Sequence, residues 1–443
     1  MRACHSGWFR AVLALCAIWW LHPRLAWADG AFPDEFSIHF QPGAPHRILM
    51  GANFGLLISE DDGATWRYTC EPWVVSSSNA ALSNTSVNFY QVTAEGVLLA
   101  NALTVTRSED VACTWPTVTG VASGTRITDV FPDPNDATFA LAIGVVLNPT
   151  NVVSYIVASD DAGKSFDAPH LYETADLLTG VELARSKPGV AYATTVSVSG
   201  GAARFLSSTD RGAHWTSTTL AIPSGTEPRI LAVDPEDDQK VYLRLVTSTS
   251  DSILMTENGG QSFQTVLPPI GTSLSAFLIA GDGTLYAGTR TGKLYVRPAG
   301  ATDFTALNAP HLRCLGQRPG TARIYACADM IADGFSLATS DDHGQSFQRM
   351  MSFTELLGPL TCAPVQTNCA AHWARIQGVL GITGDGGTPG PPDAGNPDAG
   401  TAPAPKPGGG PSGCSSAGGS TAAFLGLVAV VLLWRTRRPH PGR

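Results

Sequence analysis

The chain has 443 residues, of which 15% are charged and 44% are hydrophobic, and its formal net charge is -9. Nucleic-acid partners require clustered Lys and Arg, and no basic run occurs away from the two ends, so we expect no nucleic-acid partner. The interior is rich in Val, Ile, Thr, Ser and Gly and lacks long helical periodicity, which predicts an all-β protein.

Residues 1–28 have the features of a secretory signal peptide. Two arginines precede an apolar run at residues 11–21, and Ala26 and Ala28 form the A-x-A pattern of a cleavage site. We expect cleavage after Ala28 and export of the chain from Asp29 onward. A retained membrane helix is the alternative, which the short apolar run disfavours.

An octapeptide recurs along the interior. Five clear copies read SEDDGATW, SDDAGKSF, STDRGAHW, TENGGQSF and SDDHGQSF, and they begin at Ser59, Ser159, Ser208, Thr256 and Ser340. Degenerate copies, SEDVACTW at Ser108 and RPAGATDF at Arg297, fill the two longer gaps. The resulting seven repeats are about 41 to 51 residues long, a period that fits four strands of a propeller blade.

We therefore predict a single β-propeller of seven four-stranded blades over residues 29–382. In each octapeptide the short acidic or amide side chain caps its own turn, glycine permits a positive φ, and the closing aromatic fills space between sheets. We expect these residues to be structural rather than catalytic. They are Asp61, Gly63, Trp66, Asp110, Trp115, Asp161, Gly163, Phe166, Asp210, Gly212, Trp215, Asn258, Gly260, Phe263, Asp342, Gly344 and Phe347.

The octapeptides resemble Asp-boxes, also called bacterial neuraminidase repeats, with the pattern S-x-D-x-G-x-[ST]-[WF]. Together with the Asp-Pro turns, they are similar to the propellers of sortilin-type receptors, photosystem assembly factors and xyloglucan-active glycoside hydrolases. The resemblance covers residues 36–347 and implies the propeller fold, with the boxes on the blade periphery away from the ligand face. The F-R-I-P motif that sialidases carry before their first box is missing.

Six cysteines remain between the signal peptide and the tail, an even number that predicts up to three disulfides in an exported domain. Spacing favours Cys314 with Cys327 and Cys362 with Cys369, which leaves Cys70 with Cys113. A zinc site at Cys362, Cys369 and His372 is a weaker alternative because no fourth ligand is close. We expect no metal and no cofactor.

Segment 361–382 follows the last octapeptide, and two arrangements are open for it. Its end, ARIQGVLGI, either lies against the first blade and closes the ring or forms a surface extension. Residues 383–413 are rich in Pro, Gly and Ala and offer no large apolar side chains, so we predict a disordered linker.

Residues 414–443 combine Cys414, a short apolar run at 422–434 and a basic end, which predicts a short membrane helix with its arginines on the cytoplasmic side. This order of parts resembles the C-terminal sorting signal of myxobacterial surface proteins. The resemblance implies processing near Cys414 and display on the cell surface. A plain single-pass anchor is the alternative.

Two classes of function remain. The first is a surface-displayed ligand-binding or adhesion protein, a monomer, whose loops recognise an extracellular glycan or protein, with Trp73 and Tyr172 as candidate exposed aromatics. The alternative is a glycoside hydrolase with two carboxylates on the propeller face. Its weak candidates are Asp129 and Glu182 near inner strands, since turn capping already explains Asp133 and Asp234.

Overall fold

The computed structural model describes residues 35–76, 89–101, 104–121, 125–147, 151–167 and 169–382. The expected signal peptide, the linker and the tail with Cys414 lie outside these ranges. Within them, none of the helices has the length and apolar character needed to cross a membrane.

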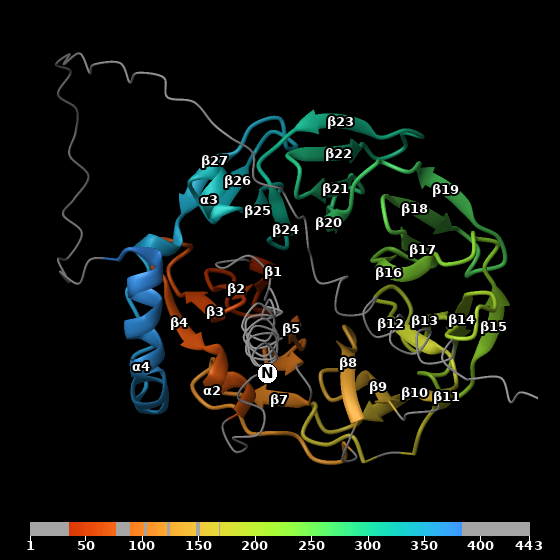
Figure 1. Ribbon diagram of the computed structural model, residues 1–443, viewed down its shortest axis with the longest axis horizontal. Coiled ribbons are helices and arrows are strands. Elements are labelled where there is room, and N and C mark those ends of the chain that lie inside the picture. The colour runs from red at the N-terminus through yellow and green to blue at the C-terminus, as the bar shows by residue number, and fades with distance from the viewer. Residues whose placement is uncertain are drawn as a thin grey trace, which may run out of the picture. The chain divides into compact units, whose positions relative to one another are not determined.

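Seven antiparallel sheets form a ring, which confirms the seven-bladed β-propeller (Figure 1). Each sheet is built from consecutive strands, and the innermost strand comes first along the chain. Blade 1 contains β1 (Glu35–Phe40), β2 (Ile48–Ala52), β3 (Gly55–Ser59) and β4 (Arg67–Cys70). Blade 2 contains β5 (Phe89–Val92), β6 (Leu98–Asn101) and β7 (Val105–Ser108). Blade 3 contains β8 (Thr125–Pro132), β9 (Ala140–Leu147), β10 (Val152–Ser159) and β11 (Tyr172–Thr174).

The remaining four blades are regular four-stranded sheets. Blade 4 contains β12 (Leu177–Leu183), β13 (Ala191–Val196), β14 (Arg204–Ser208) and β15 (Thr216–Thr219). Blade 5 contains β16 (Glu227–Asp234), β17 (Asp237–Val246), β18 (Asp251–Thr256) and β19 (Gln264–Leu267). Blade 6 contains β20 (Leu274–Ile279), β21 (Leu285–Thr289), β22 (Lys293–Arg297) and β23 (Thr305–Asn308). Blade 7 contains β24 (Leu312–Gln317), β25 (Ile324–Ala328), β26 (Leu337–Ser340) and β27 (Gln348–Met351).

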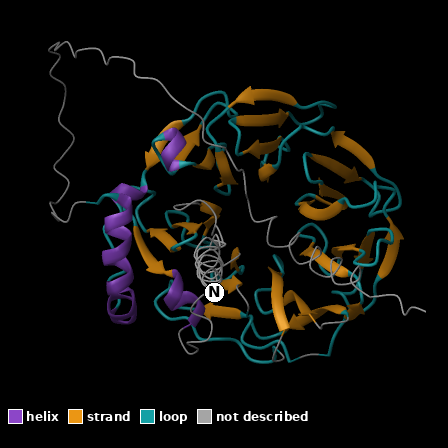
Figure 2. Cartoon of the chain, in the orientation of Figure 1, coloured by secondary structure: helices purple, strands orange, loops and turns teal. Residues whose placement is uncertain are grey.

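Blade 2 differs from the predicted four-stranded pattern. Its sheet has three strands, and its fourth position is reduced to one bridge between Thr106 and Thr117. Helical elements occupy one sector of the rim in Figure 2. They are α2 (Glu71–Ser76), α3 (Met330–Asp333), the 3-10 turn η2 (Phe353–Glu355) and α4 (Ala363–Leu380).

The hydrophobic core lies between neighbouring sheets rather than within one blade. The aromatic that closes an octapeptide packs into the interface with the preceding blade. Trp66 belongs to the cluster shared by blades 7 and 1, Trp115 to that of blades 1 and 2, and Phe166 to that of blades 2 and 3. These three side chains are at most 2% exposed. A single blade leaves such surfaces open to water, so the ring is the smallest unit that buries them.

The octapeptide forms the same turn in blades 1 to 5 and in blade 7. In the first copy, the Ser59 hydroxyl donates to Asp61 Oδ1 at 2.8 Å and accepts the Gly63 N–H at 2.8 Å. Asp61 also accepts the Thr65 N–H at 2.8 Å, and Trp66 Nε1 donates to the Gly63 carbonyl at 3.0 Å. The degenerate copy at Ser108 keeps these bonds although Ala112 replaces glycine at a φ of 67°. The hydrogen bonds therefore hold a backbone conformation that costs energy in alanine.

The segment after the last octapeptide lies against the first blade, which is the first of the two arrangements that the sequence left open. After blade 7 the chain runs parallel to β4 of blade 1, where the Tyr68 N–H donates to the Gly358 carbonyl and the Leu360 N–H donates to the Tyr68 carbonyl. Helix α4 then packs against β4, and Val365 and Ile376 join the core of blades 7 and 1. The C-terminal segment therefore closes the ring from outside the first blade.

Two of the three predicted disulfide pairings are wrong. The structure pairs Cys70 with Cys369 and Cys113 with Cys362, whereas Cys314 with Cys327 matches the expectation. Cys362 immediately precedes α4 and Cys369 lies in its second turn. Cys362 is bonded to the turn of blade 2 and Cys369 to blade 1, so they do not pair with each other. Both long-range bonds attach α4 to the rim, one to blade 1 and one to the turn of blade 2.

Candidate functional site

The two weak catalytic candidates lie on innermost strands of adjacent blades. Asp129, on β8, accepts the backbone N–H of Val181 on β12 through Oδ2 at 3.0 Å. Glu182, on β12, accepts the backbone N–H of Val233 on β16 through Oε1 at 2.8 Å. Each carboxyl group therefore connects its own strand to the inner strand of the next blade.

Both carboxyl groups have raised pKa values. Burial raises the pKa of Asp129 to about 6. Burial also raises the pKa of Glu182 to about 8, and the negative charge of Asp129 adds to this effect. These values would suit a general acid, but an acid–base role would compete with the backbone hydrogen bond that each group already makes.

The other singled-out side chains are also engaged in packing or turns. Asp133 accepts the Asn135 N–H at 2.8 Å, and Asp234 accepts the Glu236 N–H at 3.0 Å, so both cap turns. The Trp73 indole donates to the Cys113 carbonyl at 3.0 Å and packs against the core of blades 1 and 2. Tyr172 packs edge-on against Trp215 of blade 4. Trp73 and Tyr172 are thus not the free exposed aromatics that the sequence suggested.

An irregularity in blade 3 opens a pocket that sequence reasoning missed. In blades 1, 4, 5, 6 and 7 the fourth strand begins within one residue of the closing aromatic. In blade 3 the fourth strand, β11, begins only at Tyr172, six residues after the closing aromatic Phe166. Residues 164–166 instead bond to the incoming segment from blade 2, where the Phe166 N–H donates to the Thr119 carbonyl at 3.0 Å. The detour leaves part of the outer edge of β10 uncovered.

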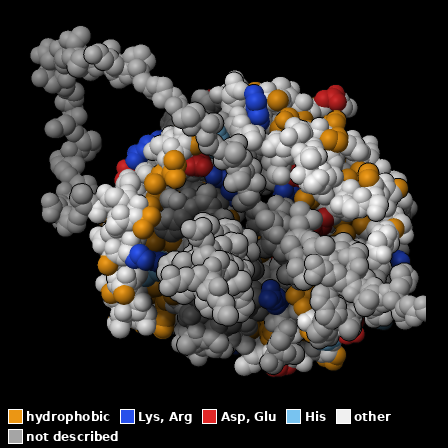
Figure 3. Space-filling model, in the orientation of Figure 1, with side chains coloured by type: hydrophobic (Ala, Val, Ile, Leu, Met, Phe, Trp, Pro, Cys, Tyr) orange, Lys and Arg blue, Asp and Glu red, His pale blue; other side chains and the backbone are white. Residues whose placement is uncertain are grey.

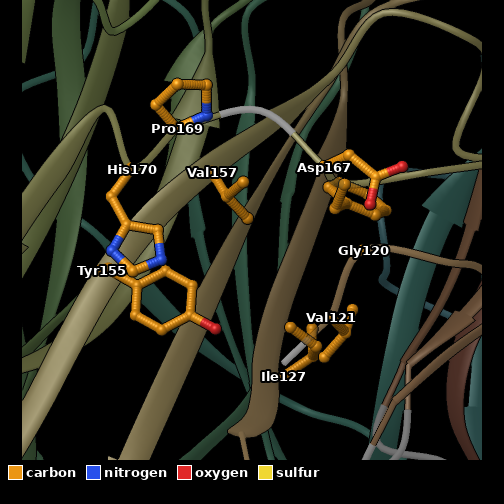
Figure 4. Close-up of a pocket in the computed structure, with 9 residues that line it drawn as sticks. Gly120, Val121, Ile127, Tyr155, Val157, Asp167, Pro169 and His170 are labelled. Atoms are coloured by element: carbon orange, nitrogen blue, oxygen red, sulfur yellow. The ribbon is translucent and has the colours of Figure 1, made fainter. Parts of the chain in front are cut away.

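The pocket between blades 2 and 3 has a volume of about 390 Å³ and is open to solvent. We call it the blade 2–3 pocket. Its apolar lining comes from Gly120, Val121, Ile127, Val157, Phe166 and Pro169. Its polar groups are Tyr155, Asp167 and His170. In Figure 4, Tyr155 and His170 lie on one side and Asp167 with Gly120 on the other, with Val157 between them.

The aromatic side of the pocket is fixed by stacking and hydrogen bonds. The rings of Tyr155 and His170 stack with centroids 3.8 Å apart and planes 8° from parallel. The Tyr155 hydroxyl donates to Thr125 Oγ1 at 2.9 Å, and His170 Nδ1 lies 3.0 Å from Glu173 Oε2. Both rings are therefore held in place before any ligand arrives, which lowers the entropy cost of binding.

The opposite side of the pocket depends on a glycine. Gly120 has a φ of 85°, and a Cβ atom there would lie 2.4 Å from Asp167 Oδ1 and 2.5 Å from Asp167 N. Only glycine permits this backbone to approach Asp167 so closely. The available sequence signal was the extra stretch DAPHL between Phe166 and Tyr172, because no other clear copy separates its closing aromatic from the next strand by so many residues.

Comparisons with known proteins identify the fold and leave the family open. No family model and no curated protein matches this chain. Among solved structures, an oligogalacturonate lyase in complex with manganese aligns with a TM-score of 0.50 and 10% identity, over 69% of this chain and 88% of that one. A prolyl endopeptidase structure aligns with a TM-score of 0.50 and 9% identity, over 72% of this chain and 49% of that one.

A glycoside hydrolase of family GH74 from Niastella koreensis aligns with a TM-score of 0.45 and 16% identity, over 60% of this chain. The chain spans only 45% of the length of that enzyme. The two likenesses with a TM-score of 0.50 support the fold alone, and none of the three carries an activity to this chain.

Charge and metal-ligand patterns of the described residues add two facts. On the face drawn in Figure 3, the Lys and Arg side chains are scattered singly among other side chains. Within the described ranges, no group of three or more His, Cys, Asp or Glu side chains is arranged to hold a metal ion.

Proposed function

We propose that this protein is a ligand-binding module, exported and anchored to the cell envelope, whose β-propeller binds an extracellular glycan or protein in the blade 2–3 pocket. The observation that carries the proposal is the pocket itself, with its stacked Tyr155 and His170 opposite Asp167. Mixed apolar and polar lining on a rigid scaffold is typical of recognition sites, and the volume lies in the range of small-ligand sites.

Two further observations support the proposal, the first on binding rather than catalysis and the second on export. The carboxyl groups of Asp129 and Glu182 are both bound to backbone N–H groups of the next blade. The three disulfides fit a protein that works in an oxidising compartment. Anchoring through residues 414–443 rests on the sequence pattern alone.

A binding array with the full-length protein tests this function. The array presents glycans and peptides, and we expect at least one ligand class to bind. Val121→Trp should reduce that binding at least tenfold, because the larger side chain fills the pocket from its lining. Thr219→Trp, on the outer strand β15 of blade 4, is the matched control and should bind as the unmodified protein does. Binding that survives Val121→Trp would place the ligand elsewhere, and an array without hits would contradict a binding function for these ligand classes.

The second candidate is a glycoside hydrolase that uses Asp129 and Glu182. The raised pKa of Glu182 favours it, since a proton donor near neutral pH needs such a value. Hydrolysis of a polysaccharide panel that disappears in both Asp129→Asn and Glu182→Gln would support this candidate. Equal, background-level hydrolysis in all three proteins would remove it.

A further inference from the structure

We propose that the blade 2–3 pocket takes a basic side chain, Lys or Arg, from a protein ligand. This inference rests on the proposed binding function and narrows it to one ligand class. Its basis is the combination of an apolar floor, a stacked ring pair and a free carboxylate in one pocket.

The floor of the pocket suits the alkyl part of a long basic side chain. Ile127, Val157 and Phe166 belong to the core of blades 2 and 3 and are at most 3% exposed, so they form a rigid apolar surface. Lys and Arg side chains pack their methylene groups on such surfaces and keep the charged head near water.

The rim of the pocket carries uncompensated negative charge. The Asp167 side chain makes no hydrogen bond or ion pair with the described residues. Among the described residues, no Lys, Arg or His side chain forms an ion pair with Asp167. Lys164 lies 3.9 Å from Glu109, and Arg126 points to the opposite face of β8 from Ile127, because neighbouring residues of a strand alternate in direction. Glu173 lies outside the pocket lining, where it is paired with His170 Nδ1.

The same protein already joins blades by placing an arginine between an aromatic ring and a carboxylate. At the junction of blades 7 and 1, the Arg318 guanidinium lies 5.7 Å from the ring centroids of Phe40 and Tyr325 and 2.7 Å from Asp62. Arg211 repeats this arrangement at the junction of blades 3 and 4. Its guanidinium lies 4.8 Å from the ring centroid of Phe139 and 2.9 Å from Asp136. In the blade 2–3 pocket Tyr155 is covered by Gly144 on one face and His170 on the other, so the ring available to a cation is His170, with the Asp167 carboxylate on the opposite side and a ligand to supply the cation.

Saturation-transfer difference NMR with the full-length protein tests the inference. The probes are acetyl-Gly-Arg-Gly-amide, the same peptide with citrulline in place of arginine, and the neutral disaccharide cellobiose. Citrulline keeps the shape of arginine but lacks the charge. We expect the arginine peptide to bind about three to ten times more tightly than the citrulline peptide, because an exposed ion pair combined with a ring contact is worth about this much.

Two variants separate the carboxylate from general surface charge. Asp167→Asn should remove the preference for arginine, whereas Asp160→Asn, an exposed acid in the octapeptide of the same blade, should retain it. Val121→Trp should weaken both peptides. Equal binding of the two peptides, or a preference that survives Asp167→Asn, would overturn the inference.

The outcomes also distinguish the two proposals. If cellobiose or another neutral or acidic ligand binds and Val121→Trp abolishes this binding, the ligand-binding function stands and the basic-side-chain inference fails. If the array and the peptides both give no binding, the two proposals fail together.

Discussion

Two junctions between blades use the same backbone arrangement and differ in what fills them. After blade 7, the chain runs parallel to the outer strand of blade 1, with a bridge between Pro359 and Tyr68. After blade 2, it runs parallel to the outer segment of blade 3, with a bridge between Thr119 and Ser165. The first junction is covered by a disulfide-bonded helix, and the second contains an open pocket.

The difference comes from what the chain must do next. Beyond Pro359 no further blade follows within the described residues, so the chain can form α4 and place His372 and Trp373 beside Tyr68. Beyond Thr119 the chain begins blade 3 at Thr125, six residues later. Within the described part of the chain, no later segment packs over this edge contact, and the pocket lies there.

The largest effect should come from the covalent link at the filled junction. Replacing Cys70 and Cys369 with alanine should lower the free energy of unfolding by about 4 kcal/mol, because with Cys113–Cys362 intact this bond closes a loop of about 50 residues in the unfolded chain. Replacing Cys314 and Cys327, only 13 residues apart, should cost about 3 kcal/mol. Denaturant titration measures both values. An equal or larger loss of stability after removal of Cys314–Cys327 would mean that the disulfide to α4 stabilises the fold less than its longer loop predicts.

A packing substitution should separate the two junctions next. Trp373 is half-buried, with its ring centroid 5.5 Å from that of Tyr68, and Trp373→Ala should cost about 2 to 3 kcal/mol. His170→Ala at the open junction should cost less than about 1 kcal/mol, since the ring is exposed. Thermal unfolding of the two variants provides the comparison. Similar losses would mean that the blade 2–3 junction carries as much packing energy as the filled one.

The regular blades should respond to pH through Glu182. Its pKa rises from 4.5 to about 8 on folding, so the folded state binds the proton more strongly than the unfolded state. Stability from this group is greatest below pH 4.5 and decreases as the pH rises towards 8. Glu182→Gln should match the unmodified protein at low pH and exceed it by about 2 kcal/mol above pH 8, less than the full shift because the residue as a whole is partly exposed and water screens part of the cost. Parallel stability curves across this pH range would show that the carboxyl titrates normally.

The smallest effect concerns the aromatic side of the pocket. Tyr155→Phe removes the hydrogen bond to Thr125 and should cost about 1 kcal/mol. Because the ring and its stacking on His170 remain, binding at the pocket should change less than twofold. Calorimetric unfolding and the peptide titration measure the two quantities. A large loss of binding would instead make the hydroxyl a direct ligand contact.

Much of the fold could be predicted from local sequence because the turn chemistry is local. Asp61 and its counterparts bond to residues within the same octapeptide, so a short pattern is sufficient to find the turn. The period between copies then gives the number of blades. Even Ala112, which replaces a glycine, adopts the same turn because the surrounding hydrogen bonds are unchanged.

The candidate site could not be predicted in this way, because its parts come from distant positions. Gly120 follows blade 2, Ile127 begins blade 3, and His170 follows the third octapeptide, and only the parallel contact at Thr119 brings them together. The disulfides failed for the same reason. Cys70 and Cys369 lie 299 residues apart, and spacing along the chain carries no information about partners that meet only when the ring closes.

The sequence by itself therefore determined the strands, the turns and the number of blades of this protein, since hydrogen bonds within each repeat fix them. Tertiary structure alone decided which junction the described C-terminal helix covers and which contains the pocket, because both outcomes depend on contacts between segments far apart along the chain.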